Sequence, residues 1–213
     1  MHLIIDFALN LRANLKVLPG HSAQEKMAPE HRLPHEQWER YYPNAKLSGV
    51  LILFYPFQSG IHTVLIQRPD YNGVHSRQVG FPGGQKEEAD QDIIYTAMRE
   101  ANEEVGVDLK SVTTLGTLTE LYVPPSNFLI TPVVAYSTDR PQFVLDKKEV
   151  VEIIEPEIKE LLNEKAIGVK SIKVGPEISI EAPYYNIHGR TVWGATAMII
   201  SELNEVIRTM KIL

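Results

Sequence analysis

Residues 81–107 read FPGGQKEEADQDIIYTAMREANEEVGV, and this stretch decides how the rest of the chain is interpreted. A Pro-Gly-Gly turn leads into a polar loop, and the loop leads into apolar residues at helical spacing that end at a glycine. At about 100° per residue, the apolar residues form one stripe: Ile94, Ala97, Met98, Ala101 and Val105. Glu100 and Glu104 lie together on one flank of the stripe, and Glu103 lies one step further round. Arg99 points to the opposite side. The sequence therefore predicts an amphipathic helix with three carboxylates at the edge of its buried face.

Three carboxylates on neighbouring turns repel one another, and like charges at this spacing destabilise a helix. A divalent cation would offset that cost, because carboxylate oxygens are the ligands that Mg²⁺ and Mn²⁺ prefer in proteins. The alternative is that pairs of glutamates only solvate an exposed face of the helix. The residues of this helix alone leave both interpretations open.

The composition is typical of a soluble globular protein, with 213 residues, 44% apolar residues and 23% charged residues. The length suits one large domain. The chain has no cysteine, which excludes disulfides, zinc-thiolate sites and cysteine nucleophiles. With a net charge of −6, the chain lacks the excess of positive charge that is typical of nucleic-acid-binding proteins. A bound metal could still attract an anionic substrate. The N-terminal residues 1–15 are typical of a helix and not of a signal peptide, and no apolar run is long enough to span a bilayer. We therefore expect a cytoplasmic protein.

Outside residues 81–107, the pattern mixes helices and strands without the regular alternation of a doubly wound sheet, which indicates an α+β fold. Helices are predicted over residues 4–18, 35–42, 156–163 and 193–210. Strands are predicted over residues 48–55, 61–67, 113–123, 128–137, 149–154, 170–174, 178–180 and 184–187. The first two strands should form a hairpin around residues 58–60. Residues 19–34 are predicted to be an extended connection, and residues 68–80 a loop.

The end of the predicted helix carries a known motif. Residues 99–107, REANEEVGV, match the REUxEExGU half of the Nudix box, in which U is a bulky apolar residue. Ala101 is smaller than usual at its U position. The first half departs from the general pattern, because eight residues separate Asp90 from Arg99, whereas seven residues usually separate a Glu from the Arg, and Gln91 holds that position here. The chain thus resembles the Nudix hydrolases, and the extra residue resembles their coenzyme A pyrophosphatase branch.

Other stretches resemble the same branch. Its upstream signature is roughly LLTxR(S/A), then an inner Arg and an inner Gly, then FPGG. Here Leu65-Ile66-Gln67-Arg68-Pro69 precedes the FPGG of residues 81–84, and Gly73 and Arg77 replace the inner Arg and Gly. Downstream, residues 122–126 (YVPPS), 149–150 (EV) and 192–196 (VWGAT) also look like that branch.

The resemblance implies a fold and a reaction. The fold would be a Nudix-type α/β/α sandwich, with a mixed, mainly antiparallel sheet between helices, forming a single domain over residues 1–213. Residues 1–45 would be an N-terminal helical arm, and residues 46–213 a core with the Nudix box at 84–107. The reaction would be Mg²⁺- or Mn²⁺-dependent hydrolysis of a nucleoside diphosphate-linked substrate, first of all coenzyme A or its thioesters, giving 3′,5′-ADP and 4′-phosphopantetheine. ADP-ribose or a dinucleotide is the alternative substrate, and a non-catalytic Nudix ligand-binding module is the alternative to an enzyme.

The resemblance also implies roles for individual residues. The metal ligands would be Glu100, Glu103, Glu104 and the carbonyl of Gly84. Arg99 would orient the glutamates, and the general base would be Glu103 or Glu149. The substrate-binding residues would be Arg68, Arg77 and Phe81. Asp90 would order the loop and the helix start, whereas His75 is interpreted as a surface residue of the loop. The expected partner is a small-molecule nucleotide, with no nucleic acid and no membrane, and a homodimer is possible.

Overall fold

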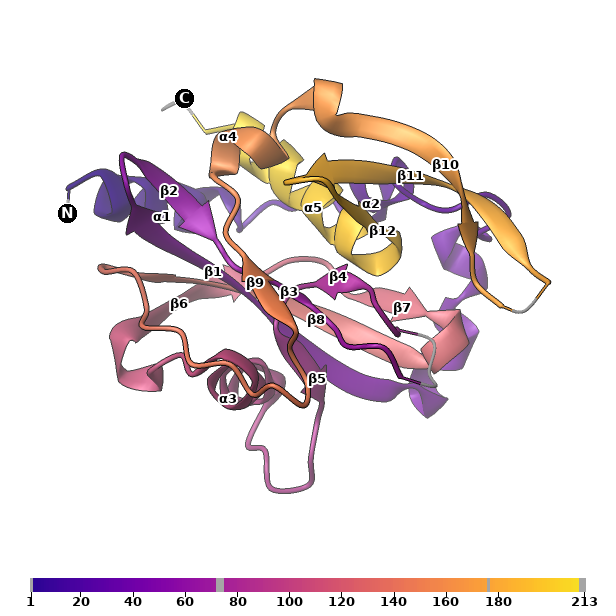
Figure 1. Cartoon of the computed structure of the whole chain (residues 1–213), viewed down its shortest axis with the longest axis horizontal. Coiled ribbons are helices and arrows are strands. Elements are labelled where there is room, and N and C mark those ends of the chain that lie inside the picture. The colour runs from indigo at the N-terminus through magenta and orange to yellow at the C-terminus, as the bar shows by residue number, and fades with distance from the viewer. Residues whose placement is uncertain (1, 72–74, 176, 211–213) are drawn as a thin grey trace.

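The central element of the structure, a computed structural model that describes residues 2–71, 75–175 and 177–210, is β1 (Lys46–Phe57) (Figure 1). Successive side chains of a strand point to opposite faces. Ile52 and Phe54 accordingly lie in one core cluster, whereas Leu51, Leu53 and Tyr55 lie in a second one on the other face. The nearly continuous apolar run of this strand therefore reflects burial on both faces.

The main sheet is built around β1. It pairs in parallel with β8 (Phe128–Ser137) and antiparallel with β2 (Gly60–Thr63) and β5 (Gly83–Gln85). The far edge of β8 pairs antiparallel with β6 (Val112–Thr117) and β7 (Leu121–Val123). Two smaller antiparallel sheets follow the orders β4-β3-β9 and β10-β11-β12. Their strands are β3 (Leu65–Gln67), β4 (Val79–Gly80), β9 (Glu152–Ile154), β10 (Ile167–Lys173), β11 (Ser179–Ile187) and β12 (Arg190–Trp193).

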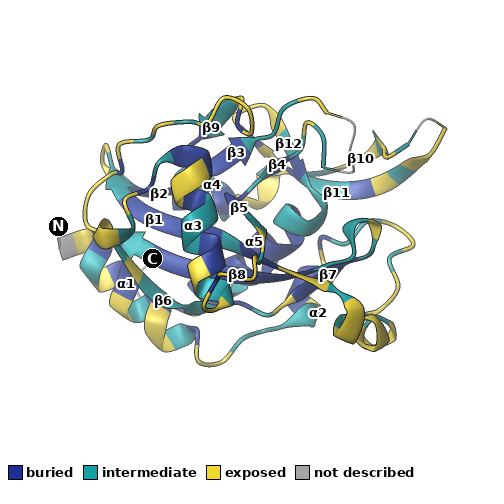
Figure 2. Ribbon diagram, turned by 90° about the horizontal axis from the view of Figure 1, so that it is seen from below, coloured by how far each residue is buried: buried dark blue, intermediate teal, exposed yellow. Residues whose placement is uncertain are grey.

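Helices cover both faces of the main sheet. The second core cluster lies under α3 (Ile93–Val105), and the first lies under α1 (His2–Asn14) and α5 (Gly194–Arg208). Figure 1 shows α3 and α5 on opposite sides of the central strands, and Figure 2 shows β1 and β8 as buried. The short helices are α2 (His21–Glu25) and α4 (Ile158–Leu161), and 3₁₀ turns span His35–Gln37, Glu39–Asn44, Leu109–Ser111, Pro124–Ser126 and Glu164–Ala166. The predicted α+β sandwich with a mixed, mainly antiparallel sheet is confirmed.

Two predicted strands are each divided in the structure. The strand expected over 61–67 breaks at Val64, because β2 pairs with β1 whereas β3 pairs with β4 and β9. The strand expected over 113–123 becomes β6 and β7, which both pair with β8. A hydrophobic pattern does not show where a chain passes from one strand partner to the next, so neither division could be predicted from the sequence. The hairpin at residues 58–60 is confirmed, with Phe57 opposite Gly60.

The predicted break at Ala182-Pro183 is wrong, because β11 continues through both residues. A proline lacks the N–H that a central strand needs. This one is tolerated because β12 pairs with β11 only from Tyr184 to Ile187, which leaves Pro183 with a strand neighbour, β10, on one side.

Other element boundaries also differ from the predictions. The last helix begins at Gly194, after Trp193 has ended β12. The helix α4 is capped by Glu157, so Pro156 lies before it and not at its first turn. The connection over 19–34 contains α2, the helix expected over 35–42 consists of 3₁₀ turns, and β9 begins three residues later than expected.

A buried carboxylate fixes the N-terminal part of the chain to α5. Glu202 is fully buried and accepts hydrogen bonds from the side chain of Gln24 (2.8 Å) and from the backbone N–H (3.3 Å) and hydroxyl (2.5 Å) of Thr119. We predict that Glu202→Ala lowers the free energy of unfolding by about 3 kcal/mol, because it leaves these donors unsatisfied. Urea unfolding measures the change. The control, Glu205→Ala, removes a partly exposed ion pair with Lys26 and should cost under about 1 kcal/mol; equal losses in both variants would contradict the prediction.

Candidate active site

The helix α3 lies very close to β1. Asp92 caps its N-terminus by accepting a hydrogen bond from the N–H of Tyr95 (2.7 Å), and Gly106 ends it in the left-handed conformation (φ 73°). A Cβ at Gly49 of β1 would lie 2.7 Å from the carbonyl oxygen of Ile93. Glycine at position 49 therefore permits a helix–strand distance that places the glutamates of α3 against β5.

Glu104 is the most buried of these glutamates, with 1% of its side chain exposed. One carboxylate oxygen accepts a hydrogen bond from Nη1 of Arg68 (3.0 Å), and the other accepts one from the backbone N–H of Gly83 (2.8 Å). Burial raises the pKa of Glu104 to about 7, with further upward contributions from Glu100 and Glu149, although Arg68 and the Gly83 N–H act in the opposite direction.

Glu100 lies one turn earlier, against the backbone of β5. A Cβ at Gly84 would lie 2.4 Å from the Glu100 carboxylate, so a larger residue there would displace this carboxylate from its position beside the strand. The carbonyl of Gly84 accepts a hydrogen bond from the hydroxyl of Ser48 (2.8 Å). Burial raises the pKa of Glu100; Arg99 opposes that shift, and Glu103 and Glu149 add to it.

Arg99 joins the loop before α3 to the helix. Its Nε and Nη2 donate to the two carboxylate oxygens of Asp90 (2.9 and 3.0 Å), and its Nη1 donates to Glu103 (2.9 Å) and lies 3.0 Å from Glu100. The prediction that Arg99 points away from the carboxylates is wrong. The helical position fixes only the Cα–Cβ direction, and the long side chain turns back along the helix to satisfy its planar set of donors.

Asp90 accepts more hydrogen bonds than those from Arg99. The N–H of Glu87 (2.9 Å) and the hydroxyl of Thr96 (3.0 Å) also donate to it. The guanidinium of Arg99 and these donors hold the pKa of Asp90 well below its usual range, although its burial acts in the other direction. Asp90 thus fastens the loop and the first turns of the helix, which is the role expected for it.

Two further carboxylates, those of Glu149 and Glu103, lie near Glu100 and Glu104. Glu149 lies in an exposed turn just before β9. The turn is joined to the end of α3, because the N–H of Asp146 donates to the carbonyl of Glu104 (2.9 Å) and the N–H of Glu149 donates to the carbonyl of Asp146 (3.0 Å). The charge of Glu149 also contributes to raising the pKa of Glu100 and of Glu104. Glu103 has 54% of its side chain exposed and is held by Arg99. The structure therefore brings four glutamates from α3 and the turn before β9 to one side of the molecule.

A cleft of about 250 Å³, here called the Arg68 cleft, adjoins these groups. It is lined by Ser48, Val50, Arg68, Tyr71, His75, Gln78, Val79, Gly80, Phe81, Gly83, Gly84, Phe128, Ile130, Ala195, Thr196 and Ile199. Phe128 and Ile130 of β8 and Ala195 and Ile199 of α5 contribute apolar side chains to it. Arg68 and Gly83 connect the cleft directly to Glu104, because both donate a hydrogen bond to its carboxylate.

The comparison with known families decides the assignment. Residues 45–172 match the family profile described as NUDIX domain. The chain belongs to the Nudix family. A relative from Yersinia enterocolitica, named an uncharacterized Nudix hydrolase NudL, is 33% identical over 141 residues, which cover 66% of this chain and 71% of the relative. A relative of the same name from Photorhabdus laumondii is 32% identical over 135 residues, covering 63% and 71%.

Solved structures agree on the fold. The Nudix hydrolase RenU from M. smegmatis superposes with a TM-score of 0.55 at 15% identity, over 88% of this chain and 96% of that one. The MutT protein from Methanosarcina mazei superposes with a TM-score of 0.50 at 13% identity, over 77% of this chain and 95% of that one. At these identities the likeness shows the Nudix fold alone.

Two of the three substrate-binding residues predicted for this Nudix chain line the Arg68 cleft, and one does not. Arg68 and Phe81 line the Arg68 cleft. Arg77 does not line it; its side chain is 74% exposed and ion-paired with Asp70. Gly73 lies outside the described residues. His75 lies in a loop, as expected, and is half-buried where it lines the cleft; its Nδ1 lies 3.1 Å from the side-chain oxygen of Gln78.

Sequence reasoning missed the far wall of the cleft. Phe128 and Ile130 reach it because β8 pairs in parallel with β1, with Ser48 opposite Ile130. Thr196 and Ile199 reach it from α5, where the hydroxyl of Thr196 donates to the carbonyl of Val79 (3.1 Å). No motif marks Phe128, Ile130 or Ile199, and although Thr196 ends the VWGAT stretch, nothing in that stretch shows that it faces the FPGG segment, which it meets only through the packing of distant elements.

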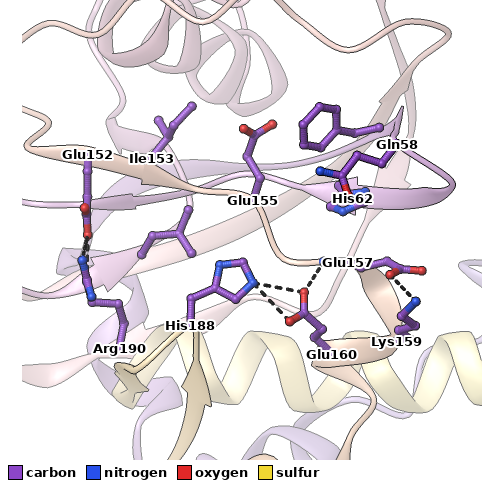
Figure 3. Close-up of a pocket in the computed structure, with 12 residues that line it drawn as sticks. Gln58, His62, Glu152, Ile153, Glu155, Glu157, Lys159, Glu160, His188 and Arg190 are labelled. Carbon is purple, nitrogen blue, oxygen red and sulfur yellow. Dashed lines mark hydrogen bonds and ion pairs between the residues drawn. The ribbon is translucent and has the colours of Figure 1, made fainter.

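A second cleft of about 570 Å³ lies between β2, β9, α4 and the turn from β11 to β12 (Figure 3). Its charged residues are paired: Arg190 with Glu152 (2.7 Å), His188 with Glu160 (3.1 Å), Lys159 with Glu157 (2.5 Å), and Glu155 with Arg140 outside the cleft (2.7 Å). It is the larger space, and a Nudix-box glutamate lines neither cleft, but Arg68 and Gly83 of the Arg68 cleft donate to Glu104, whereas the charges of the second cleft are already paired. The Arg68 cleft is therefore the candidate active site of this Nudix protein.

The donors beside the Arg68 cleft suit a hard divalent cation. Glu100, Glu104 and the carbonyl of Gly84 offer only oxygen, which Mg²⁺ and Mn²⁺ prefer. The absence of a Cβ at Gly84 lets the Glu100 carboxylate lie against that backbone segment. Within residues 2–71, 75–175 and 177–210, no three acidic or histidine side chains already converge as a cation site. Arg68 holds Glu104, and Arg99 holds Glu103 and contacts Glu100.

Proposed function

We propose that this Nudix protein is a divalent-metal-dependent diphosphatase that hydrolyses coenzyme A or its thioesters to 3′,5′-ADP and 4′-phosphopantetheine. The observation that carries the proposal is the placement of Glu100 and Glu104, one helical turn apart, against the glycines that line the Arg68 cleft. A site of this kind places carboxylates and a guanidinium beside a space that a nucleotide could occupy.

The metal would be held by Glu100 and Glu104, with the carbonyl of Gly84 and the carboxylate of Glu103 as further donors. A bound Mg²⁺ or Mn²⁺ supplies positive charge that offsets the negative charge developing on the phosphoryl oxygens. Arg99 orients Glu103 and Glu100 through the contacts of 2.9 and 3.0 Å and is itself fixed by Asp90.

Glu149 is the favoured general base for the attacking water. The carboxylate of Glu103, the alternative, already accepts a hydrogen bond from Arg99 at 2.9 Å. Glu149 is exposed, and its turn is hydrogen-bonded through Asp146 to the carbonyl of Glu104, which supports a role for it near the proposed metal ligands. A base must come within hydrogen-bond reach of the water that it deprotonates.

Coenzyme A is the favoured substrate because three of the stretches that resemble its pyrophosphatases meet at one cleft. Arg68 comes from the upstream signature, Phe81 and the two glycines from FPGG, and Ala195 and Thr196 from the VWGAT stretch, and all of them line the Arg68 cleft. A further stretch, residues 149–150, contributes Glu149 in the turn that is hydrogen-bonded to the end of α3, whereas the YVPPS stretch at residues 122–126 does not line this cleft. The exposure of Arg77 leaves Arg68 as the arginine of this region that faces the cleft.

A substrate panel tests the proposal. We expect coenzyme A and acetyl-CoA to be cleaved in the presence of Mg²⁺ or Mn²⁺, with 3′,5′-ADP identified by mass, and ADP-ribose, NADH and diadenosine polyphosphates to be cleaved more slowly. Cleavage of ADP-ribose with coenzyme A untouched would overturn the substrate assignment and leave the diphosphatase chemistry in place. No cleavage of any of them would favour a ligand-binding module.

Three predictions from the sequence remain predictions. They are the single domain over residues 1–213, the possible homodimer and the cytoplasmic location. The helices α1 and α5 share one core cluster with β1, which supports a single domain. Among the described residues, no helix has both the length and the apolar character needed to cross a bilayer.

A further inference from the structure

Arg68 occupies a position between the candidate metal ligand and the cleft. Its Nη1 donates to the carboxylate of Glu104 at 3.0 Å, and its Nη2 donates to the carbonyl of Gly83 at 2.9 Å. A quarter of its side chain is exposed, and it lines the Arg68 cleft, whereas Glu104 behind it is buried. One side of the guanidinium therefore donates a hydrogen bond to Glu104, and the other side is accessible to a molecule in the cleft.

This position sets the charge that a cation would meet. The two carboxylate oxygens of Glu104 each accept one hydrogen bond, from Arg68 and from the N–H of Gly83. A cation that approaches Glu104 meets the fixed positive charge of Arg68 and competes with it for the same carboxylate. Because the site is shielded from water, the repulsion between the two positive charges is screened little.

The other arginines near the site cannot replace Arg68 in this role. Arg99 is committed to Asp90 through two hydrogen bonds of 2.9 and 3.0 Å and does not line the cleft. Arg77 is ion-paired with Asp70 outside it. Among the residues that line the Arg68 cleft, Arg68 is the permanent positive charge, since His75 is charged only when protonated.

We propose that Arg68 couples cation binding to diphosphate binding, by leaving Glu104 for the phosphate oxygens when a nucleoside diphosphate enters the cleft. The cation then binds weakly alone and tightly together with the diphosphate. Arginine suits this exchange, because its planar fork binds carboxylate and phosphate in the same geometry. The inference rests on the proposed function, since it takes a diphosphate as the ligand and Glu104 as a metal ligand. The coupling is reciprocal, so the cation strengthens diphosphate binding by the same factor.

The test is calorimetric titration of Mn²⁺ with and without α,β-methylene-ADP, a diphosphate that is not hydrolysed at its bridging carbon. The affinity of the free analogue for Mn²⁺ is measured separately and included in the fit. For the unmodified protein, we expect the analogue to tighten Mn²⁺ binding by about 10-fold or more, within the usual range of coupling between sites. In Arg68→Gln, which keeps a donor for Glu104 but removes the charge, Mn²⁺ alone should bind about 10-fold tighter, and the analogue should change its affinity by less than about 3-fold.

Two further variants make the result decisive. Arg68→Met removes both the charge and the donors and should give the same loss of coupling as Arg68→Gln, so either variant that folds, as judged by circular dichroism, is sufficient. Arg77→Met removes an exposed arginine outside the cleft and should behave as the unmodified protein. Mn²⁺ binding and coupling in both Arg68 variants equal to those of the unmodified protein would overturn the inference.

The same titration separates this inference from the proposed function. If Glu100→Gln and Glu104→Gln lose Mn²⁺ binding while the Arg68 variants keep the full coupling, only the role of Arg68 is wrong. If the two glutamate variants bind Mn²⁺ as tightly as the unmodified protein, the metal site itself is wrong, and the inference falls with it.

Discussion

Glu104→Gln is expected to lower the kcat of diphosphate hydrolysis by about 10³-fold or more while the protein stays folded. Of the glutamates of α3, Glu104 is the most buried, and its carboxylate accepts hydrogen bonds from Arg68 (3.0 Å) and from the N–H of Gly83 (2.8 Å). Glutamine has nearly the same shape but no charge, so it removes the strongest proposed cation ligand. Because the cation stabilises the negative charge of the transition state, we expect its loss to lower kcat more than it lowers the affinity for substrate.

Stability should change much less than turnover. The single amide oxygen of glutamine can accept from Arg68 or from the N–H of Gly83 but not fully from both, so a loss of about 1–3 kcal/mol in the free energy of unfolding is expected. Thermal unfolding measures that change, and steady-state kinetics with Mg²⁺ measure turnover. Glu88→Gln is the matched control, because Glu88 is exposed in the loop before α3. Equal turnover in Glu104→Gln and in the unmodified protein, at saturating Mg²⁺, would remove Glu104 from the site.

The helical half of the site could be predicted from the sequence because a single local rule determines it. The spacing of 3.6 residues per turn fixes which residues face the core, and Ala97, Ala101 and Val105 are buried as expected. The same rule placed Glu100 and Glu104 on one flank, and the structure places them against neighbouring glycines of β5. The strand over 128–137 was predicted with its correct bounds for a similar reason, since a proline-rich turn precedes it and its residues are mostly apolar.

The remaining half depends on contacts between distant segments. Phe128 and Thr196 are 68 residues apart in the chain (196 minus 128) and meet only because β8 lies beside β1 and α5 packs across the sheet. The reason for glycine at position 84 is likewise invisible in the sequence, because the atom that excludes a Cβ belongs to Glu100. The direction of Arg99 could not be predicted either, since side-chain length lets the guanidinium return to Asp90.

The contact between Asp90 and Arg99 is expected to contribute much of the stability of the loop before α3. Its side chain is 1% exposed, and it binds Arg99 through two hydrogen bonds while also accepting from Thr96 (3.0 Å) and the N–H of Glu87 (2.9 Å). Removing one partner of a buried ion pair leaves the other charge uncompensated, which commonly costs 3–5 kcal/mol. Because Asp90 lies in a loop near the surface, where water can reach Arg99, we expect about 3 kcal/mol for Asp90→Asn.

The cost of Asp90→Asn should depend on pH, and the sign follows from the direction of the pKa shift. The pKa of Asp90 in the folded protein is lowered, chiefly by its hydrogen bonds to Arg99. A carboxyl group of this kind stabilises the fold at any pH above its ordinary value of about 4, and its contribution declines as the pH falls below that value. The difference in the free energy of unfolding between the unmodified protein and Asp90→Asn should therefore be constant from about pH 5 to pH 7 and shrink by about 1 kcal/mol or more by pH 3. Urea unfolding at these pH values measures it. The exposed helix cap Asp92→Asn is the control, because asparagine caps helices as well as aspartate does. A difference for Asp90→Asn that is as large at pH 3 as at pH 7 would show that the charge of Asp90 does not stabilise the turn before α3.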